Sequence, residues 1–335
     1  MWSLKLSSIV FTPTLMSGIL MMLTTNNWIS IWIGMEINMY SFIPIMYSAS
    51  SSKTQEAATK YFVIQAFASG ILILGVLSSS SLNMYSLPIL LALLLKAGIA
   101  PMHFWFPSVM SILPWSTCLM LTTFQKIGPI MLIMYIIHDQ TAIMSIISAT
   151  SAITGAIGGL NQTQLRTILA YSSIGHMGWI MACAQLNTSM AKLYFLIYII
   201  TVSSIILNIM FLQMKSNLQN QSHSNPQNLM KPMTMMLLLS LGGMPPFLGF
   251  FPKLMVISML TMNNFIKLPI ILIISSMLNM FYYLKIFYSV FFSSSNKMFS
   301  SPLPFMPKLY TTTMMFLSLL STIFILIIII PYMMT

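Results

Sequence analysis

Five ionisable side chains lie inside long apolar runs of this sequence, where any chemistry would proceed away from bulk water. They are Glu36, Lys96, Lys126, Lys253 and His176. Each charged group held at the centre of a lipid bilayer costs roughly 2.5 to 3.5 kcal/mol. The glutamate and the three lysines must therefore be paired, hydrated in a polar channel, or neutral.

Pairing alone cannot neutralise these groups. The chain has only three acidic residues, and two of them, Glu56 and Asp139, fall near the ends of the apolar runs. Glu36 is left to serve one lysine, and we predict that this partner is Lys96. A lysine without a counter-charge at this depth favours its neutral form, so it can bind and release a proton at physiological pH. The pattern predicts a proton relay.

Other interpretations apply to several of the ionisable residues. A lysine close to a helix end can extend its ammonium group to the membrane surface, and this is also the alternative for Lys253. We expect it for Lys5, Lys60, Lys192, Lys267 and Lys285. His176, on an apolar helix, fits a hydrogen-bonded packing residue as well as it fits a relay member.

The composition places these residues in a membrane protein. Of 335 residues, 57% are hydrophobic and 5% are charged, and apolar runs recur along the whole length, which is typical of a polytopic membrane protein. No polar interval is long enough to form a soluble domain, so we predict one integral membrane domain over residues 1–335. The net charge of +11 comes from basic residues spaced singly, which indicates orientation in a membrane rather than nucleic-acid binding.

The elements that position the charged residues are predicted to be about eleven transmembrane helices, since a helix needs about 20 mostly apolar residues to cross a bilayer. We place them near residues 7–24, 28–47, 58–78, 86–106, 114–137, 141–159, 165–185, 192–213, 233–262, 268–291 and 309–331. The basic residues between spans divide about eight to two between the two faces. This bias predicts that the N-terminus lies on the positive side, and an odd number of spans places the C-terminus opposite.

An internal repeat is indicated by two short segments. GIAPMHFWF at residues 98–106 and GGMPPFLGF at residues 242–250 share Gly-x-x-Pro and a final Phe, and each has a lysine nearby. They fall in the fourth and ninth spans, so a unit of about five spans would be repeated and inverted in the membrane. We predict repeats at about 1–138 and 139–292, then a last helix at about 309–331. Glycine and proline should break the two spans at Gly98, Pro101, Gly242, Gly243, Pro245 and Pro246.

No other type of site is indicated by the sequence. Cys118 and Cys183 have no metal-ligand spacing and are expected to be buried thiols. Neither a phosphate-binding glycine loop nor a hydrolytic triad has recognisable spacing. We therefore predict that this chain holds no metal, nucleotide, flavin or conventional catalytic residue, and that it binds no small molecule except protons and water.

Five motifs resemble one known family. They are LKAGIAPMHFWFP, TFQKIGPIM, GGLNQTQLRTILAYSSIGHMGW, LSLGGMPPFLGFFPK and TQEAATKYFVIQA. They are similar to motifs of the antiporter-like subunits of mitochondrial NADH:ubiquinone oxidoreductase, respiratory complex I, in particular the subunit 2 family, which is related to Mrp-type cation/proton antiporters. The likeness runs in order from about Trp28 to Tyr288.

The resemblance implies a role for each charged residue inside a matching motif. Glu36 takes the place of the glutamate that pairs with a broken-helix lysine, which matches Lys96. Lys126 takes the place of the bridging lysine between two half-channels. Lys253 takes the place of the second broken-helix lysine.

The resemblance also implies a setting. The protein would be a multi-pass protein of the mitochondrial inner membrane, with its N-terminus in the matrix and its C-terminus in the intermembrane space. Its partners would be other membrane-arm subunits of complex I and lipids, while NADH, FMN, iron–sulfur clusters and ubiquinone would belong to other subunits. The sequence departs from many members at Ser108, where they have an acid, and at Thr167, where they have a second basic residue. No charged role carries over at those two places.

Three functions follow from these observations. The leading hypothesis is a proton-translocating subunit of complex I, driven by ubiquinone reduction in another part of the enzyme. The first alternative is a scaffold whose charges lock neighbouring subunits together. The second is a free-standing cation/proton antiporter, which the small number of acidic residues disfavours.

Overall fold

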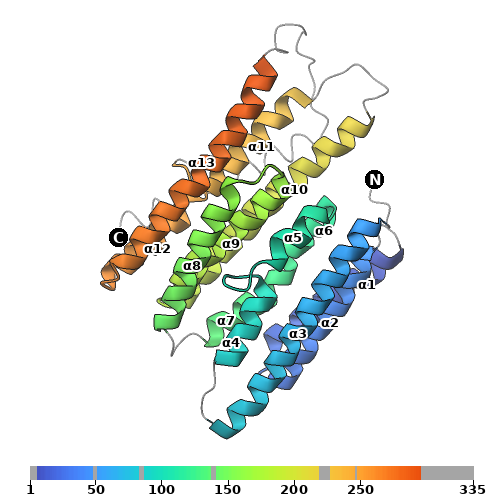
Figure 1. Cartoon of the computed structure of the whole chain (residues 1–335), viewed down its shortest axis with the longest axis vertical. Coiled ribbons are helices and arrows are strands. Elements are labelled where there is room, and N and C mark those ends of the chain that lie inside the picture. Colours follow the sequence, from blue (N-terminus) through green and yellow to red (C-terminus); the bar gives the residue numbers. More distant parts are fainter. Residues whose placement is uncertain are drawn as a thin grey trace. The chain divides into compact units, whose positions relative to one another are not determined.

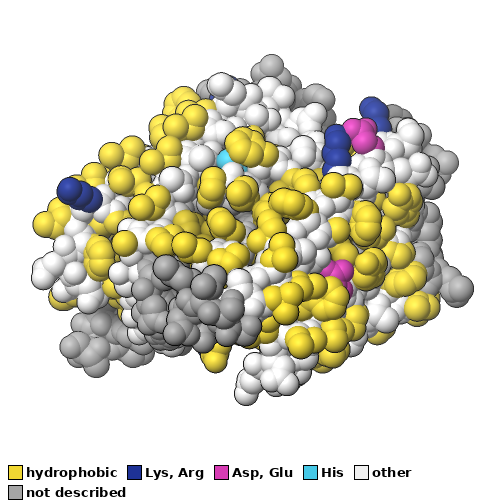
Figure 2. Space-filling view, turned by 60° about the horizontal axis from the view of Figure 1, so that its bottom comes forward, with side chains coloured by type: hydrophobic (Ala, Val, Ile, Leu, Met, Phe, Trp, Pro, Cys, Tyr) yellow, Lys and Arg dark blue, Asp and Glu magenta, His cyan; other side chains and the backbone are white. Residues whose placement is uncertain are grey.

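The computed structural model describes residues 6–47, 51–82, 87–136, 141–218, 227–245 and 247–295. Thirteen α-helices and no strand lie within these ranges (Figure 1). Six helical segments there are long and apolar enough to cross a membrane. Figure 2 shows a face on which hydrophobic side chains are numerous and charged ones are few. These features confirm the predicted all-helical, multi-pass class.

The helices form two compact units, Met1–Lys192 and Leu193–Thr335, which are described separately. The first unit contains α1 (Leu6–Thr24), α2 (Trp28–Tyr47), α3 (Ser52–Leu82), α4 (Leu87–Ala97), α5 (Trp105–Ile112), α6 (Trp115–Thr122), α7 (Phe124–Ile136), α8 (Thr141–Leu160) and α9 (Leu165–Ala184). Helix α10 (Thr188–Leu218) crosses the boundary. The second unit also contains α11 (Gln227–Gly242), α12 (Phe250–Met262) and α13 (Lys267–Ser295).

Each of the first ten expected spans overlaps one or two of these helices, while the expected span at 309–331 lies outside the described residues. Two interruptions fall where glycine and proline predicted them, between α4 and α5 and between α11 and α12. One interruption was not expected. The span placed at 114–137 is divided into α6 and α7 at Thr123, a single residue outside helical geometry with φ −112° and ψ −76°.

Small residues allow the closest helix pairs in the first unit to form. Helices α1 and α2 run side by side in Figure 1, and so do α8 and α9. A Cβ atom added at Gly18 of α1 would lie 2.9 Å from the carbonyl oxygen of Gly34 in α2. A Cβ atom added at Gly155 of α8 would lie 2.5 Å from the backbone nitrogen of Gly175 in α9. Glycine at these crossings brings the two backbones together.

Helix α4 ends in a Schellman motif. Gly98 has a left-handed φ of +67°. Its N–H donates to Leu95 O at 3.2 Å, and the Ile99 N–H donates to Leu94 O at 3.1 Å. These bonds satisfy carbonyl groups that would otherwise be left without partners at the end of the helix. Pro101 lies in the segment that follows, between α4 and α5.

Helix α11 ends in the same way. Gly243 has a φ of +88°, its N–H donates to Ser240 O at 3.0 Å, and the Met244 N–H donates to Leu239 O at 3.3 Å. Gly242 is the last helical residue and Pro245 follows in the connecting segment, whereas Pro246 lies outside the described residues. Both breaks therefore use one local geometry.

The sequence alignment pairs Gly98 with Gly242. The backbone geometry of the two breaks shifts this pairing by one residue. The interval from Gly98 to Trp105, the first residue of α5, equals the interval from Gly243 to Phe250, the first residue of α12. Gly98 thus matches Gly243 rather than Gly242. In this register the dipeptide Phe106-Pro107 also matches Phe251-Pro252.

We predict that Gly155→Ala destabilises the first unit by about 2 kcal/mol, because the new methyl group meets backbone atoms of α9 that cannot rotate away. Gly70→Ala in α3 is the matched control, since nothing lies within 4 Å of its added Cβ atom. Thermal unfolding of the two purified variants in detergent measures the difference. Equal unfolding temperatures would contradict the close α8–α9 packing.

Candidate functional site

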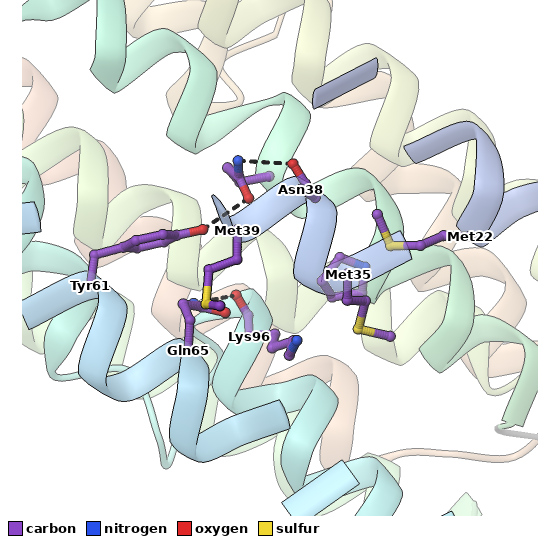
Figure 3. A pocket seen from close by; sticks show the side chains of 9 residues that line it. Met22, Met35, Asn38, Met39, Tyr61, Gln65 and Lys96 are labelled. Carbon is purple, nitrogen blue, oxygen red and sulfur yellow. Dashed lines mark hydrogen bonds between the residues drawn. The ribbon is translucent and has the colours of Figure 1, made fainter. Parts of the chain in front are cut away.

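Lys96 lies in the last turn of α4 and is only 6% exposed. It lines a small pocket together with polar side chains from α2, α3 and α7 and with several methionines (Figure 3). The space open to the centre of a water molecule is about 10 Å³, which is close to what one water needs. The ammonium-bearing side chain is therefore next to a polar pocket of the size of a single water molecule.

The polar lining of this pocket is connected by hydrogen bonds. The Tyr61 hydroxyl donates to Gln125 Oε1 at 3.0 Å, and Gln125 Nε2 donates to Asn38 Oδ1 at 3.0 Å. Gln65 Nε2 donates to the backbone oxygen of Lys96 at 3.4 Å. Figure 3 shows these side chains converging from separate helices. None of these side chains carries a charge, so nothing in the sequence distinguishes them from other polar residues in the apolar runs.

Glu36 lies on α2, the helix that also carries Asn38. It lies close enough to Lys96 and Tyr61 for a charge on its carboxyl group to act on both. Its Oε1 atom is buried and has no hydrogen-bond partner among the described residues. Within that part of the chain Glu36 and Lys96 form no direct ion pair, in contrast to Glu56 and Lys60, whose side chains are 2.6 Å apart at the start of α3.

Lys126 occupies a second buried site in the same unit. It lies on α7, is 1% exposed, and its Nζ atom donates to Ser173 Oγ of α9 at 3.2 Å. The ammonium group also lies 4.3 Å from the centre of the Phe106 ring, a cation–π contact. His176 is buried on α9, one turn after Ser173 and thus on a similar side of the helix. Lys126 therefore contacts α9, the helix that also carries His176.

Lys253 belongs to the second unit. It lies on α12, is 5% exposed, and its Nζ atom donates to Gly242 O at 2.6 Å. A Cβ atom added at Gly243 would lie 2.7 Å from the same Nζ atom. The side chain is therefore directed at the helix break instead of the surface. A cation at the C-terminal end of a helix is also favoured by the helix dipole.

The two broken helices carry their lysines on opposite sides of the break. In the register set by Gly98 and Gly243, Lys253 takes the position of Ser108, which follows the first break. Lys96 precedes its break, at the position of Leu241 in the second. The two breaks therefore share their backbone geometry but not the placement of the lysine.

The remaining candidates have simpler environments. Among the lysines expected at the membrane surface, those that the structure describes are exposed: Lys60, Lys192, Lys267 and Lys285. Lys5 lies outside the described residues. Cys118 and Cys183 are buried free thiols, and the described residues contain no group of three or more potential metal ligands.

Comparison with known proteins assigns the chain to a family. The family model described as NADH:quinone oxidoreductase/Mrp antiporter, TM, matches residues 25–81 and 76–279. The chain belongs to this family. Within it, the chain is 42% identical to NADH-ubiquinone oxidoreductase chain 2 of Anopheles gambiae over 274 residues, covering 78% of this chain and 79% of that protein. It is 36% identical to the protein of the same name from Canis lupus familiaris, covering 93% and 96%.

Solved structures show the same family fold. A chain of respiratory complex I from Thermus thermophilus superposes with a TM-score of 0.78 at 21% identity, covering 97% of this chain and 79% of that chain. A chain of the Mrp complex from a Dietzia species superposes with a TM-score of 0.72 at 18% identity, covering 82% and 59%. The helix arrangement is thus shared between complex I and Mrp antiporter chains.

We predict that Trp105→Phe costs about 1 kcal/mol in stability, since the Trp105 indole N–H donates to Leu95 O at 3.0 Å across the first break. Trp32→Phe is the matched control, because the Trp32 indole nitrogen is buried without a hydrogen-bond partner among the described residues. Chemical unfolding of both variants in detergent provides the comparison. A larger loss in Trp32→Phe would show that the Trp105 hydrogen bond does not hold the break.

Proposed function

We propose that this chain is a proton-translocating, antiporter-like membrane-arm subunit of respiratory complex I. The observation that carries the proposal is the burial of three lysines, each at most 6% exposed, in a chain of this family. Such groups are costly at bilayer depth and are characteristic of ion and proton paths. The chain would be part of an NADH:ubiquinone reductase and would carry no redox centre of its own.

The proposed relay uses a small set of groups with defined surroundings. Glu36 and Lys96 form the first member, and the charge of one stabilises the opposite charge on the other. Lys126 forms the second member with Ser173, and His176 lies one turn further along α9. Lys253 at its helix break forms a third. In each member the lysine Nζ binds a proton in one state and releases it in the next, driven by a change in the charge of its neighbours.

The family fold supports a finer proposal for the architecture: two inverted repeats of five helices at about 1–138 and 139–292, then a last helix at about 309–331, making about eleven spans. Helices α1, α2 and α3 have 19, 20 and 31 residues. Helices α8, α9 and α10 have 20, 20 and 31 residues and follow in the same order. A broken helix comes next in both series. One membrane domain would contain both repeats, although the compact packing units divide within α10.

We place the protein in the mitochondrial inner membrane, with its N-terminus in the matrix and its C-terminus in the intermembrane space. The animal relatives named NADH-ubiquinone oxidoreductase chain 2 support this location, and the bias of basic residues supports the orientation. Other membrane-arm subunits and lipids would surround the chain. NADH, FMN, iron–sulfur clusters and ubiquinone would be bound by other subunits of the complex.

We expect Lys96→Met and Glu36→Gln to lower ubiquinone-linked turnover about tenfold in the assembled complex, which corresponds to about 1.4 kcal/mol in the activation barrier. Both substitutions remove a charge from the first member of the relay. Lys285→Met is the matched control, since Lys285 is an exposed lysine within a helix. Turnover and proton pumping in reconstituted vesicles, together with native gels, measure the effects.

These measurements, together with a transport assay on the isolated chain, separate the three functions. Normal turnover with full pumping stoichiometry in both variants would contradict the relay. Loss of the assembled complex on native gels would favour the scaffold, in which the buried charges only join subunits. Sodium-dependent transport by the isolated chain in liposomes would favour a free-standing antiporter.

A further inference from the structure

Three neutral side chains beside Lys96 form a continuous hydrogen-bonded chain that the proposed relay does not use. Tyr61 comes from α3, Gln125 from α7 and Asn38 from α2. All three are buried, with exposed fractions of 2%, 8% and 4%. Burying three polar side chains inside a membrane domain is costly unless each finds a partner. Their mutual hydrogen bonds meet that requirement.

The chain has a direction. The Tyr61 hydroxyl donates to Gln125 Oε1, and Gln125 Nε2 donates to Asn38 Oδ1, each at 3.0 Å. Because the Asn38 oxygen is engaged, its amide N–H groups form the end of the chain. They donate to no described residue, and Asn38 lines the same pocket as Lys96. Asn38, at the end of this chain, and Lys96 therefore line the same pocket from different helices (Figure 3).

One water molecule fits the chemistry of this pocket. The volume matches a single water. A water oxygen can accept from Asn38 and from a protonated Lys96, and a water proton can be donated to a carboxylate. Glu36, whose Oε1 atom has no hydrogen-bond partner among the described residues, is not part of the pocket lining, so the site depends on Asn38 and Lys96.

We propose that Gln125 is a positioning residue for the Lys96 site, and that it orients Asn38 so that its amide N–H groups hold a single water molecule against Lys96. The proposal rests on the proposed relay function and adds to it a fixed water site. No proton passes through the amides. Their role is to hold the water oxygen in one place while Lys96 gains or loses its proton.

Glutamine has the two properties that this position requires. It must accept from Tyr61 and donate to Asn38 at the same time, and a neutral amide does both. Gln125 also immediately precedes Lys126, whose ammonium group bonds Ser173 on α9. Consecutive residues of α7 thus serve the Lys96 pocket and the Lys126 site. The orientation of α7 is fixed from both sides by these two side chains.

The test compares Gln125→Leu with Gln125→Glu in the assembled complex. A protonated glutamate can accept from Tyr61 and donate to Asn38, but an ionised glutamate can only accept. Gln185→Glu is the matched control, since Gln185 is outside the pocket and its side chain has no hydrogen-bond partner in the described residues. The readout is ubiquinone-linked turnover as a function of pH.

The pH profile must be interpreted against every polar group around the site. Helix α2 contributes Glu36 and Asn38, and α3 contributes Tyr61 and Gln65. Lys96 comes from α4, and Lys126 follows Gln125 on α7. Helix α1 contributes only the apolar Met22 to the pocket. A titration that appears in Gln125→Glu and in no other variant therefore belongs to the new carboxyl group.

We expect turnover in Gln125→Leu to be roughly tenfold lower at all pH values, an effect of the size of one lost hydrogen bond near the reacting group. Gln125→Glu should approach the unaltered turnover at low pH and lose it as pH rises. Gln185→Glu should follow the unaltered profile. Equal, pH-independent losses in both Gln125 variants, unaltered turnover in both, or failure of both to assemble would overturn the proposal. If Lys96→Met slows pumping while both Gln125 variants pump normally, the positioning role fails and the relay stands.

Discussion

The energetic cost of an ammonium group in a membrane interior is the constraint on which the rest of this structure depends. The two buried lysines of the first unit meet that cost in different ways. Lys96 has a polar pocket and the charge of Glu36. Lys126 has the Ser173 hydroxyl and the face of the Phe106 ring. Both arrangements surround the lysine with polar or aromatic groups that can support its charge.

The helix breaks follow from the same constraint. A continuous helix uses its own carbonyl groups and leaves none for a buried cation. Lys253 obtains a carbonyl partner because α11 ends at Gly242, and Gly243 leaves room for the ammonium group. At the other break Lys96 lies before the end of its helix, and its backbone carbonyl accepts from Gln65. The second break thus supplies a carbonyl partner to the ammonium group of its lysine, whereas at the first break the bond is made by the lysine backbone.

Much of the fold could be predicted from the sequence because the apolar runs are long and the helix breakers are few. The long apolar runs predict the spans around Glu36 and Lys96. The helix breakers predict the interruptions near Gly98 and Gly243. The register between the two breaks was misplaced by one residue, since two consecutive glycines compete for the left-handed position and only backbone geometry decides between them. The division at Thr123 contains neither glycine nor proline, so the residue types give no indication that the helix is interrupted there.

The charged members of the candidate site could also be found from the sequence, but not their neutral surroundings. A single charge in an apolar run is conspicuous, whereas Gln125, Asn38 and Tyr61 are far apart in the chain and acquire meaning only when three helices meet. The Ser173 contact to Lys126 is of the same kind. Long-range hydrogen bonds between neutral side chains depend on tertiary packing, which residue types alone do not specify.

The most direct test of the relay is an experimental structure of the intact complex at a resolution that shows water molecules, inspected around Glu36, Lys96, Lys126 and Lys253. We predict ordered water in contact with the lysine Nζ atoms, including one molecule between Lys96 and Asn38. Dry lysines, each capped by a carboxylate of a neighbouring subunit, would contradict it and would identify the buried charges as contacts that hold the complex together.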